Sequence, residues 1–244
     1  MGMYIISDST GEPVDWKIKH FANISGSEEF MAQLMMEMPE LVDAGTIREP
    51  ERQKLKEAIA EICTVGLMPA FEHLKSIRAL KAQSLPELNR KQLYETLTIV
   101  LWRAYKDLMQ TAAKMMEPEF GFLFQSEAKF ESGLAKWIAR RPRQAGMADY
   151  FRKRRTEWQT ELGEFRNYLE HRDETNPARY AQHYEPAHAE LIFEAVWRTI
   201  ADIIAMLVSM HLPSNTILVE IPTTQRDPVR PRRFRYAMPR LPKP

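Results

Sequence analysis

The clearest hydrophobic pattern in the chain runs through residues 88–116. Apolar residues recur there at intervals of three and four, the spacing that places side chains on one face of an α-helix. Two breakers, Pro118 and Gly121, follow the pattern and predict where the helix ends. We therefore expect one long amphipathic helix, with a stripe formed by Leu93, Leu97, Val100, Leu101, Ala104, Leu108, Ala112 and Met115.

Similar spacing predicts further helices on both sides of this one. Before it, the pattern covers residues 25–38, 50–65 and 70–83, with a break at Pro39 and a limit or kink at Pro69. After it, we expect helices at 128–140, 147–171 and 188–212. The apolar stripe of the second of these consists of Tyr150, Phe151, Trp158, Leu162, Phe165 and Leu169.

Strand-like patterns occur only towards the two ends of the chain. We expect residues 3–6 and 216–221 to pair as a small sheet, and residues 16–21 have a similar character. The proline-rich segment after Pro222 is predicted to be extended or disordered. The prediction is an all-α fold in three parts: an N-terminal extension (1–85), a helical bundle (86–215), and a short strand with a basic tail (216–244).

Charge is unevenly distributed, although the net charge of the 244 residues is only +1. Residues 136–155 contain eight basic side chains against one acidic, and residues 226–244 contain seven against one. Such stretches attract polyanions, or they are a solvated helix face and a disordered tail. Only nine glycines occur and no glycine-rich loop is present, which argues against dinucleotide-binding and P-loop folds.

The single cysteine excludes an intrachain disulfide and a cysteine-based zinc site. Cys63 follows Ile59 and Ile62 and is expected to be a small buried residue. Charged residues interrupt the apolar run at 191–212, which favours a core helix over a membrane span. We expect a cytoplasmic protein without a signal peptide.

The segment with the most specific chemistry is Arg166-Asn167-Tyr168-Leu169-Glu170-His171, at the end of the helix predicted for 147–171. At about 100° per residue, Asn167 and His171 share one face and Arg166 lies beside Asn167. An imidazole can move a proton, a guanidinium can hold phosphate oxygens, and an amide can orient either group. This combination suits phosphodiester chemistry and requires no metal or other cofactor.

Arg166-Asn167-x-x-x-His171 resembles the R-x(4–6)-H motif of the HEPN superfamily, in its spacing and in the polar residue after the arginine. The order of predicted helices over about residues 86–215 is also similar to that of the family. The resemblance implies a compact helical bundle with the motif at a helix end. It leaves residues 1–85 and the tail unexplained.

Many HEPN proteins are metal-independent ribonucleases that act as toxins or defence effectors, with two motifs meeting across a dimer. For this chain the resemblance implies Arg166 and His171 as the catalytic pair, Asn167 as a supporting group, RNA as substrate and a homodimer with a possible antitoxin or other partner protein. Some toxins of the family carry a modified tyrosine two residues after the histidine, where this chain has Asp173. Other members have lost the reaction and serve as modules that bind a partner protein or nucleotide.

Two further readings stay open. Arg166 could pair with Glu170, and His171 would then only cap the end of the helix. Upstream on the same helix, a basic run could grip distant RNA phosphates or form a solvated face; it consists of Arg152, Lys153, Arg154 and Arg155.

A metal site at His183, Glu185 and His188 is the weakest candidate. Pro186 interrupts any helix there, and the spacing matches no standard ligand pattern. We expect a surface loop at this position and predict no metal site.

Overall fold

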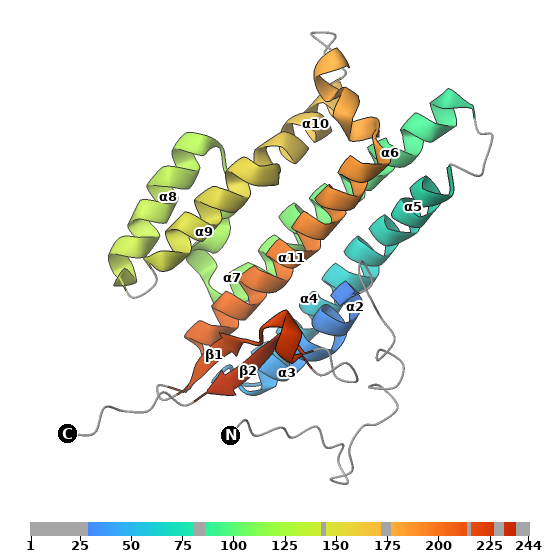
Figure 1. The fold of residues 1–244 in the computed structure, drawn as a ribbon. Helices are drawn as coiled ribbons and strands as arrows, with labels where there is room; N and C mark the ends of the chain where they lie inside the picture. The colour runs from blue at the N-terminus through green and yellow to red at the C-terminus, as the bar shows by residue number, and fades with distance from the viewer. Residues whose placement is uncertain are drawn as a thin grey trace. The chain divides into compact units, whose positions relative to one another are not determined.

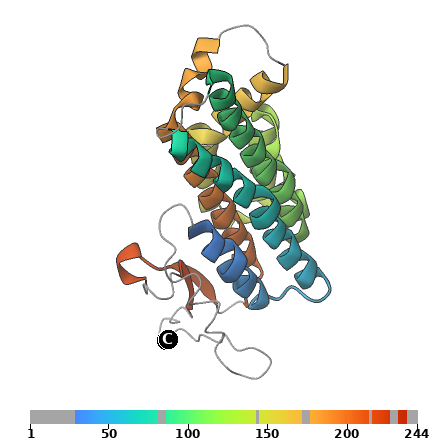
Figure 2. The same ribbon diagram turned by 90° about the vertical axis from the view of Figure 1, so that its right-hand side faces the viewer.

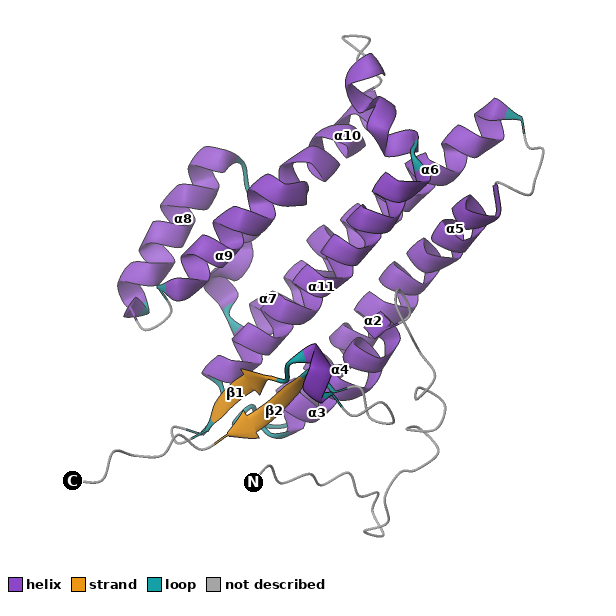
Figure 3. Ribbon diagram, viewed as in Figure 1, coloured by secondary structure: helices purple, strands orange, loops and turns teal. Residues whose placement is uncertain are grey.

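The structure is a computed structural model that describes residues 29–80, 86–142, 145–171, 177–213, 216–226 and 232–237. These residues form an all-α fold with one small two-stranded sheet, as predicted (Figure 3). Contacts divide the chain into a central unit, Glu61–Ile200, and a terminal unit, Met1–Ala60 together with Ala201–Pro244. The boundaries predicted from the sequence, after residues 85 and 215, differ from those of the two units. The three-part division stays a prediction.

The central unit contains most of the helices that the hydrophobic pattern predicted. The apolar pattern at residues 88–116 forms a continuous helical run, and the predicted helices at 128–140 and 147–171 are also confirmed. In chain order the elements are η3 (Ile62–Leu67), α5 (Met68–Ala79), α6 (Glu87–Arg103), η5 (Ala104–Leu108), α7 (Met109–Met116), η6 (Pro118–Phe124), α8 (Glu127–Arg140), α9 (Gly146–Arg154), η8 (Arg155–Gln159), α10 (Thr160–His171), η9 (Pro177–Tyr184) and the first part of α11 (Pro186–Met210).

Two prolines predicted to break helices lie inside helical runs. Pro39 follows a π-helical turn, η2 (Gln33–Glu37), and Pro69 follows the π-helical turn η3. In each turn the residue before the proline donates its backbone N–H five positions back, Met38 to the carbonyl of Gln33 and Met68 to that of Cys63. Each proline is the second residue of the next α-helical segment, so it lies in the first turn of that segment and does not end the run.

Close packing of α10 on α6 fixes the helix that carries the Arg166–His171 motif. The two helices are in contact, and an added Cβ at Gly163 would lie 2.9 Å from Cη2 of Trp102. The side-by-side arrangement of α5 and α6 is visible in Figures 1 and 2. Buried hydrogen bonds add to this core: Trp158 Nε1 donates to Thr199 Oγ1 (3.2 Å), and the Tyr105 hydroxyl donates to Gln159 Oε1 (3.1 Å).

The terminal unit combines short helices with the sheet. Its elements are α2 (Glu29–Ala32), η2, α3 (Met38–Asp43), most of α4 (Glu51–Glu61), the end of α11, β1 (Ile217–Glu220), η10 (Thr223–Gln225) and β2 (Phe234–Ala237). The strand predicted at 216–221 is confirmed, and it pairs antiparallel with β2, Ile217 opposite Ala237 and Glu220 opposite Phe234. Residues 3–6 and 16–21 lie outside the described residues. A partner strand from within the tail was not predicted.

Tail arginines form ion pairs within the terminal unit, so they are not the solvated charges of a disordered tail. Arg226 pairs with Glu29 (3.0 Å), Arg232 with Glu40 (2.6 Å), and Arg233 with Asp202 (2.6 Å) and Glu220 (2.8 Å). Only 12–13% of the Arg226 and Arg233 side chains is exposed. Three of the four arginines in the described part of the tail are therefore compensated by local acids.

Glu37 is the most deeply buried acid of this network. It is 5% exposed, and its Oε1 accepts hydrogen bonds from the backbone N–H groups of Arg233 (2.8 Å) and Phe234 (2.6 Å). Burial raises the pKa of Glu37 to about 7, against the opposing effect of those hydrogen bonds and of the nearby arginines. In a large fraction of the molecules the Glu37 carboxyl is therefore protonated near neutral pH.

Cys63 is fully buried, as its apolar neighbours predicted. Burial raises the pKa of its thiol to about 12, so it is not a reactive thiolate at neutral pH. Within the described residues, every helix is too short or too polar to cross a bilayer.

Candidate functional site

The motif occupies the last two turns of α10, the end of a helical run that starts at Gly146. Four apolar side chains of the predicted stripe are buried and hold this run in the core: Phe151, Trp158, Leu162 and Phe165. Leu169, the last member of the stripe, is only partly buried. The helix therefore leaves the core where the motif begins, and its polar side chains reach solvent.

The three predicted site residues lie on this exposed end, and two of them are joined by a hydrogen bond. Arg166 Nη1 donates to Asn167 Oδ1 (3.2 Å), and the same guanidinium forms an ion pair with Glu170. Asn167 and His171 are exposed. Within the described part of the chain, no hydrogen bond or ion pair links His171 to either of the other two. The pairing of Arg166 with Glu170 was one of the two alternatives left open by the sequence, and it is observed.

The basic run upstream on the same helix is engaged with acids. Arg152 pairs with Glu131 (2.9 Å), Lys153 and Arg154 pair with Glu157 (3.6 and 2.8 Å), and Arg155 pairs with Glu127 (2.5 Å). Arg155 is also buried and donates to the carbonyl of Gln125 (2.9 Å). RNA binding by these four residues stays a prediction, and it would require the phosphates to compete with these acids.

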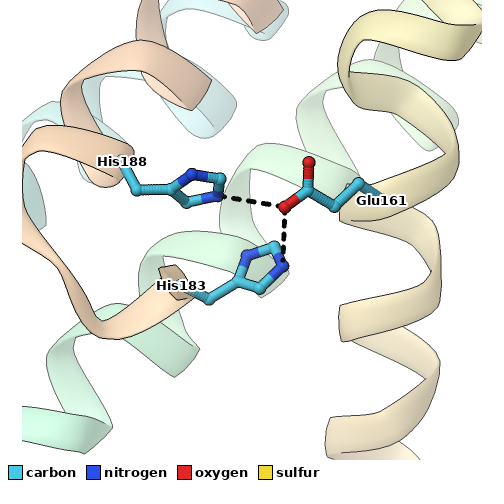
Figure 4. Close-up of side chains that lie close together, drawn as sticks. All are labelled: Glu161, His183 and His188. Atoms are coloured by element: carbon cyan, nitrogen blue, oxygen red, sulfur yellow. Dashed lines mark ion pairs between the residues drawn. The ribbon is translucent and has the colours of Figure 1, made fainter. Parts of the chain in front are cut away.

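A second polar cluster lies at the beginning of α10. Glu161, in the first turn of the helix, faces His183 from η9 and His188 from the first turn of α11 (Figure 4). Its Oε1 atom is 3.2 Å from Nε2 of His183 and 3.6 Å from Nε2 of His188. Gln182 Nε2 also donates to this oxygen. We call Glu161, His183 and His188 the histidine cluster.

Aromatic stacking holds η9 against α10 beside this cluster. Phe165 stacks on His183 with ring centroids 4.0 Å apart, and Tyr168 stacks on Tyr180 at 4.7 Å. Tyr184 meets the edge of Phe165 at 5.6 Å. The predicted motif and the histidine cluster are therefore two ends of one packed helix.

The sequence interpretation of this second region was wrong in one respect. His183 is 4% exposed and belongs to a 3-10 helix, so it does not lie on a surface loop. Pro186 does end the preceding segment, since it is the first residue of α11. At the first position of a helix a backbone N–H would have no partner within the helix, so a proline is tolerated there. The carboxylate beside the histidines comes from Glu161, whereas Glu185 is exposed.

Burial keeps both imidazoles of the histidine cluster neutral. Desolvation, with a smaller contribution from His188, lowers the pKa of His183 to about 4. Desolvation also lowers the pKa of His188, against the attraction of Glu161. Neutral imidazoles are ligands for metal ions and acceptors of hydrogen bonds.

No protein-family model matches the chain, and no characterised protein or solved structure is significantly similar to it. The function is therefore inferred from the residues themselves.

Proposed function

We propose that this protein is a HEPN-like endoribonuclease that cleaves RNA phosphodiesters without a metal ion, at a site built by two copies of the chain. The observation that supports the proposal is the placement of Arg166, Asn167 and His171 on the exposed last turns of α10. The guanidinium and the amide already touch (3.2 Å). This end of the helix offers a phosphate a cation, a hydrogen-bond donor and an imidazole together.

In the proposed reaction a neutral His171 takes the proton of a ribose 2′-hydroxyl. The 2′-oxygen attacks phosphorus, and the bond from phosphorus to the 5′-oxygen breaks. A protonated imidazole from the second copy of the motif gives its proton to that leaving oxygen. Arg166 holds the phosphate oxygens and stabilises the charge that develops on them. The products are a 2′,3′-cyclic phosphate and a 5′-hydroxyl.

The ion pair with Glu170 does not block this role. Arg166 and Glu170 side chains are 28% and 43% exposed, and ion pairs of this kind contribute about 0–1 kcal/mol. A phosphate that accepts two hydrogen bonds from the guanidinium forms a stronger interaction. Substrate can therefore displace Glu170.

Cleavage of single-stranded RNA in EDTA tests the proposal. Purified protein is expected to leave 2′,3′-cyclic phosphate ends, and His171→Ala is expected to lower the rate by about 100-fold to 10,000-fold, the range for loss of a general acid or base. His73→Ala changes a histidine of α5 outside the motif and serves as the matched control, with unchanged cleavage. Equal activity of His171→Ala and wild type would refute the catalytic role.

A non-catalytic module that binds a partner protein or nucleotide is the second candidate. The observation that favours it is that Glu170 forms an ion pair with Arg166, while among the described residues His171 forms no hydrogen bond or ion pair with Arg166 or Asn167. Under this alternative no RNA is cut, and the His171→Ala variant retains partner binding. The molar mass of the purified protein, measured during chromatography, is a further test of the ribonuclease proposal, because that proposal requires a dimer.

The cellular role follows from the proposed activity. A cytoplasmic ribonuclease of this kind acts as a toxin or defence effector and needs a partner, such as an antitoxin, that restrains it. In cells, induction of the wild-type chain is expected to arrest growth, and induction of the His171→Ala variant is not.

A further inference from the structure

The histidine cluster gathers three ligand atoms from three separate segments. Glu161 belongs to α10, His183 to η9 and His188 to α11, and their ligand atoms all lie within 4.8 Å of one another. Figure 4 shows both imidazoles directed at the Glu161 carboxylate. Each residue is held by a helical segment with its own packing, so the convergence does not depend on one flexible side chain.

One ring nitrogen of each imidazole in this cluster lacks a hydrogen-bond partner. Nε2 of His183 and Nε2 of His188 are buried, and neither forms a hydrogen bond despite its proximity to Glu161. His183 is only 4% exposed. A buried polar atom without a partner costs free energy, which indicates that a further group completes this site.

Two of the three separations between the ligand atoms are close to those around a tetrahedral metal ion, and the third, between the two histidines, is within 4.8 Å. With metal–ligand bonds of about 2.0–2.1 Å and tetrahedral angles, neighbouring ligand atoms lie about 3.3 Å apart. The distances from the Glu161 oxygen to the two nitrogens are 3.2 and 3.6 Å. An ion can therefore enter with small side-chain adjustments, displacing the amide of Gln182 from the shared oxygen.

We propose that Glu161, His183 and His188 bind one divalent transition-metal ion of the zinc class. Two imidazoles with one carboxylate form a ligand set that suits zinc and its neighbours in the first transition row, whereas Mg²⁺ and Ca²⁺ prefer sites made of oxygen atoms. The neutral state of both imidazoles is the one that ligates. Three protein ligands leave a fourth position for water or a ligand from solution.

The proposed ion is separate from the proposed chemistry. Glu161 precedes Arg166 by five residues and His171 by ten, which is about 7.5 and 15 Å along a helix axis. At those distances the ion does not coordinate the groups that the motif brings to the phosphate. Its effect is to fix η9 and the start of α11 against the helix that carries the motif, and it is expected whether or not the chain cuts RNA.

Titration of the full chain with Zn²⁺ and Co²⁺, after removal of metal with EDTA and desalting, tests the site. We expect one ion per chain by calorimetry, the visible absorption of tetrahedral Co²⁺, and a higher unfolding temperature with Zn²⁺. Glu161→Gln and His188→Gln, checked for unchanged helicity by circular dichroism, are each expected to weaken Zn²⁺ binding by at least about 100-fold, since even outer-shell partners of a metal site contribute 10–100-fold. His171→Ala removes an exposed histidine from the same helix and is expected to bind as wild type does.

The ring nitrogens of the wild-type protein give a readout that needs no variant. Zn²⁺ is expected to shift the NMR signals of Nε2 of His183 and His188 and to leave those of His73 and His171 unchanged. The proposal is overturned if wild type binds no ion, if both glutamine variants bind as wild type does, or if other histidines shift in place of these two. None of these outcomes bears on RNA cleavage by the motif.

Discussion

The two ends of α10 present polar side chains in opposite settings. At its C-terminal end Arg166, Asn167 and His171 come from one short stretch of sequence and reach solvent. At its N-terminal end Glu161 meets two histidines from other segments, one of them almost fully buried. The first group can exchange its surface ion pair for a substrate, while in the second the Nε2 atoms of both histidines are buried and without a hydrogen-bond partner. Exposure therefore suits the motif to transient contacts, and burial suits the histidine cluster to a permanently bound group.

The largest effect is expected on RNA cleavage when the exposed C-terminal end of α10 is changed and its N-terminal end is left intact. Arg166→Lys keeps the charge but loses the fork of donors that binds two phosphate oxygens, so RNA cleavage is expected to fall by about 100-fold or more, mainly in kcat. Glu161→Gln is the matched variant at the other end and is expected to retain cleavage within about threefold, because proton transfer by His171 does not involve it. Single-turnover rates in EDTA measure both. If Glu161→Gln loses as much activity as Arg166→Lys, the two ends are not independent.

A buried acid in the terminal unit extends the contrast to stability. The pKa of Glu37 is raised to about 7 from an unfolded value of 4.5, so its contribution to the free energy of unfolding is fully present below pH 4.5 and is lost as the pH rises through 7. The loss is about 3 kcal/mol relative to Glu37→Gln, which does not titrate. Urea unfolding of both proteins from pH 4.5 to 8 measures the difference, in which all other titrating groups cancel. A difference that is constant across this range would show that Glu37 is charged throughout.

Packing beneath α10 gives the next effect. Gly163→Ala places a methyl group 2.9 Å from Cη2 of Trp102, and the resulting overpacking is expected to cost about 1–3 kcal/mol of unfolding free energy. Gly146→Ala, in the first turn of α9 with nothing within 4 Å of the added Cβ, is the control and is expected to be neutral or slightly stabilising. Chemical denaturation compares the two. Equal stability of both variants would mean that α10 and α6 separate easily.

The fold was largely predictable because its signals are local. Three-and-four spacing identified α8, α11 and the runs α6–α7 and α9–α10, since each buries one stripe of its own sequence. The π-helical turns before Pro39 and Pro69 were not predictable, because they depend on how the preceding turn adjusts its hydrogen bonds. The strand β2 was missed because its partner β1 lies on the far side of a proline-rich segment.

The two polar groups of α10 differ in the same way. The spacing of Arg166 and His171 is a property of one helix, so the sequence placed both at its end. Glu161 stands 22 and 27 residues before its two histidines, and no periodicity links them. The only signal was the pair His183 and His188, which the prediction joined to the nearer carboxylate of Glu185.

The smallest effect concerns the pair that screens the motif. Glu170→Gln removes an exposed ion pair with Arg166, so the free energy of unfolding is expected to change by less than about 1 kcal/mol. The Michaelis constant for RNA is expected to fall a few-fold, because phosphate no longer competes with a carboxylate, while kcat stays the same. Glu164 lies on the same helix as Glu170 and forms an exposed ion pair with Arg179 of η9. Glu164→Gln is therefore the control for a general change in surface charge. If both variants change RNA binding equally, the effect is one of net charge. If Glu170→Gln alone weakens binding, Glu170 positions Arg166 for the substrate rather than competing with it.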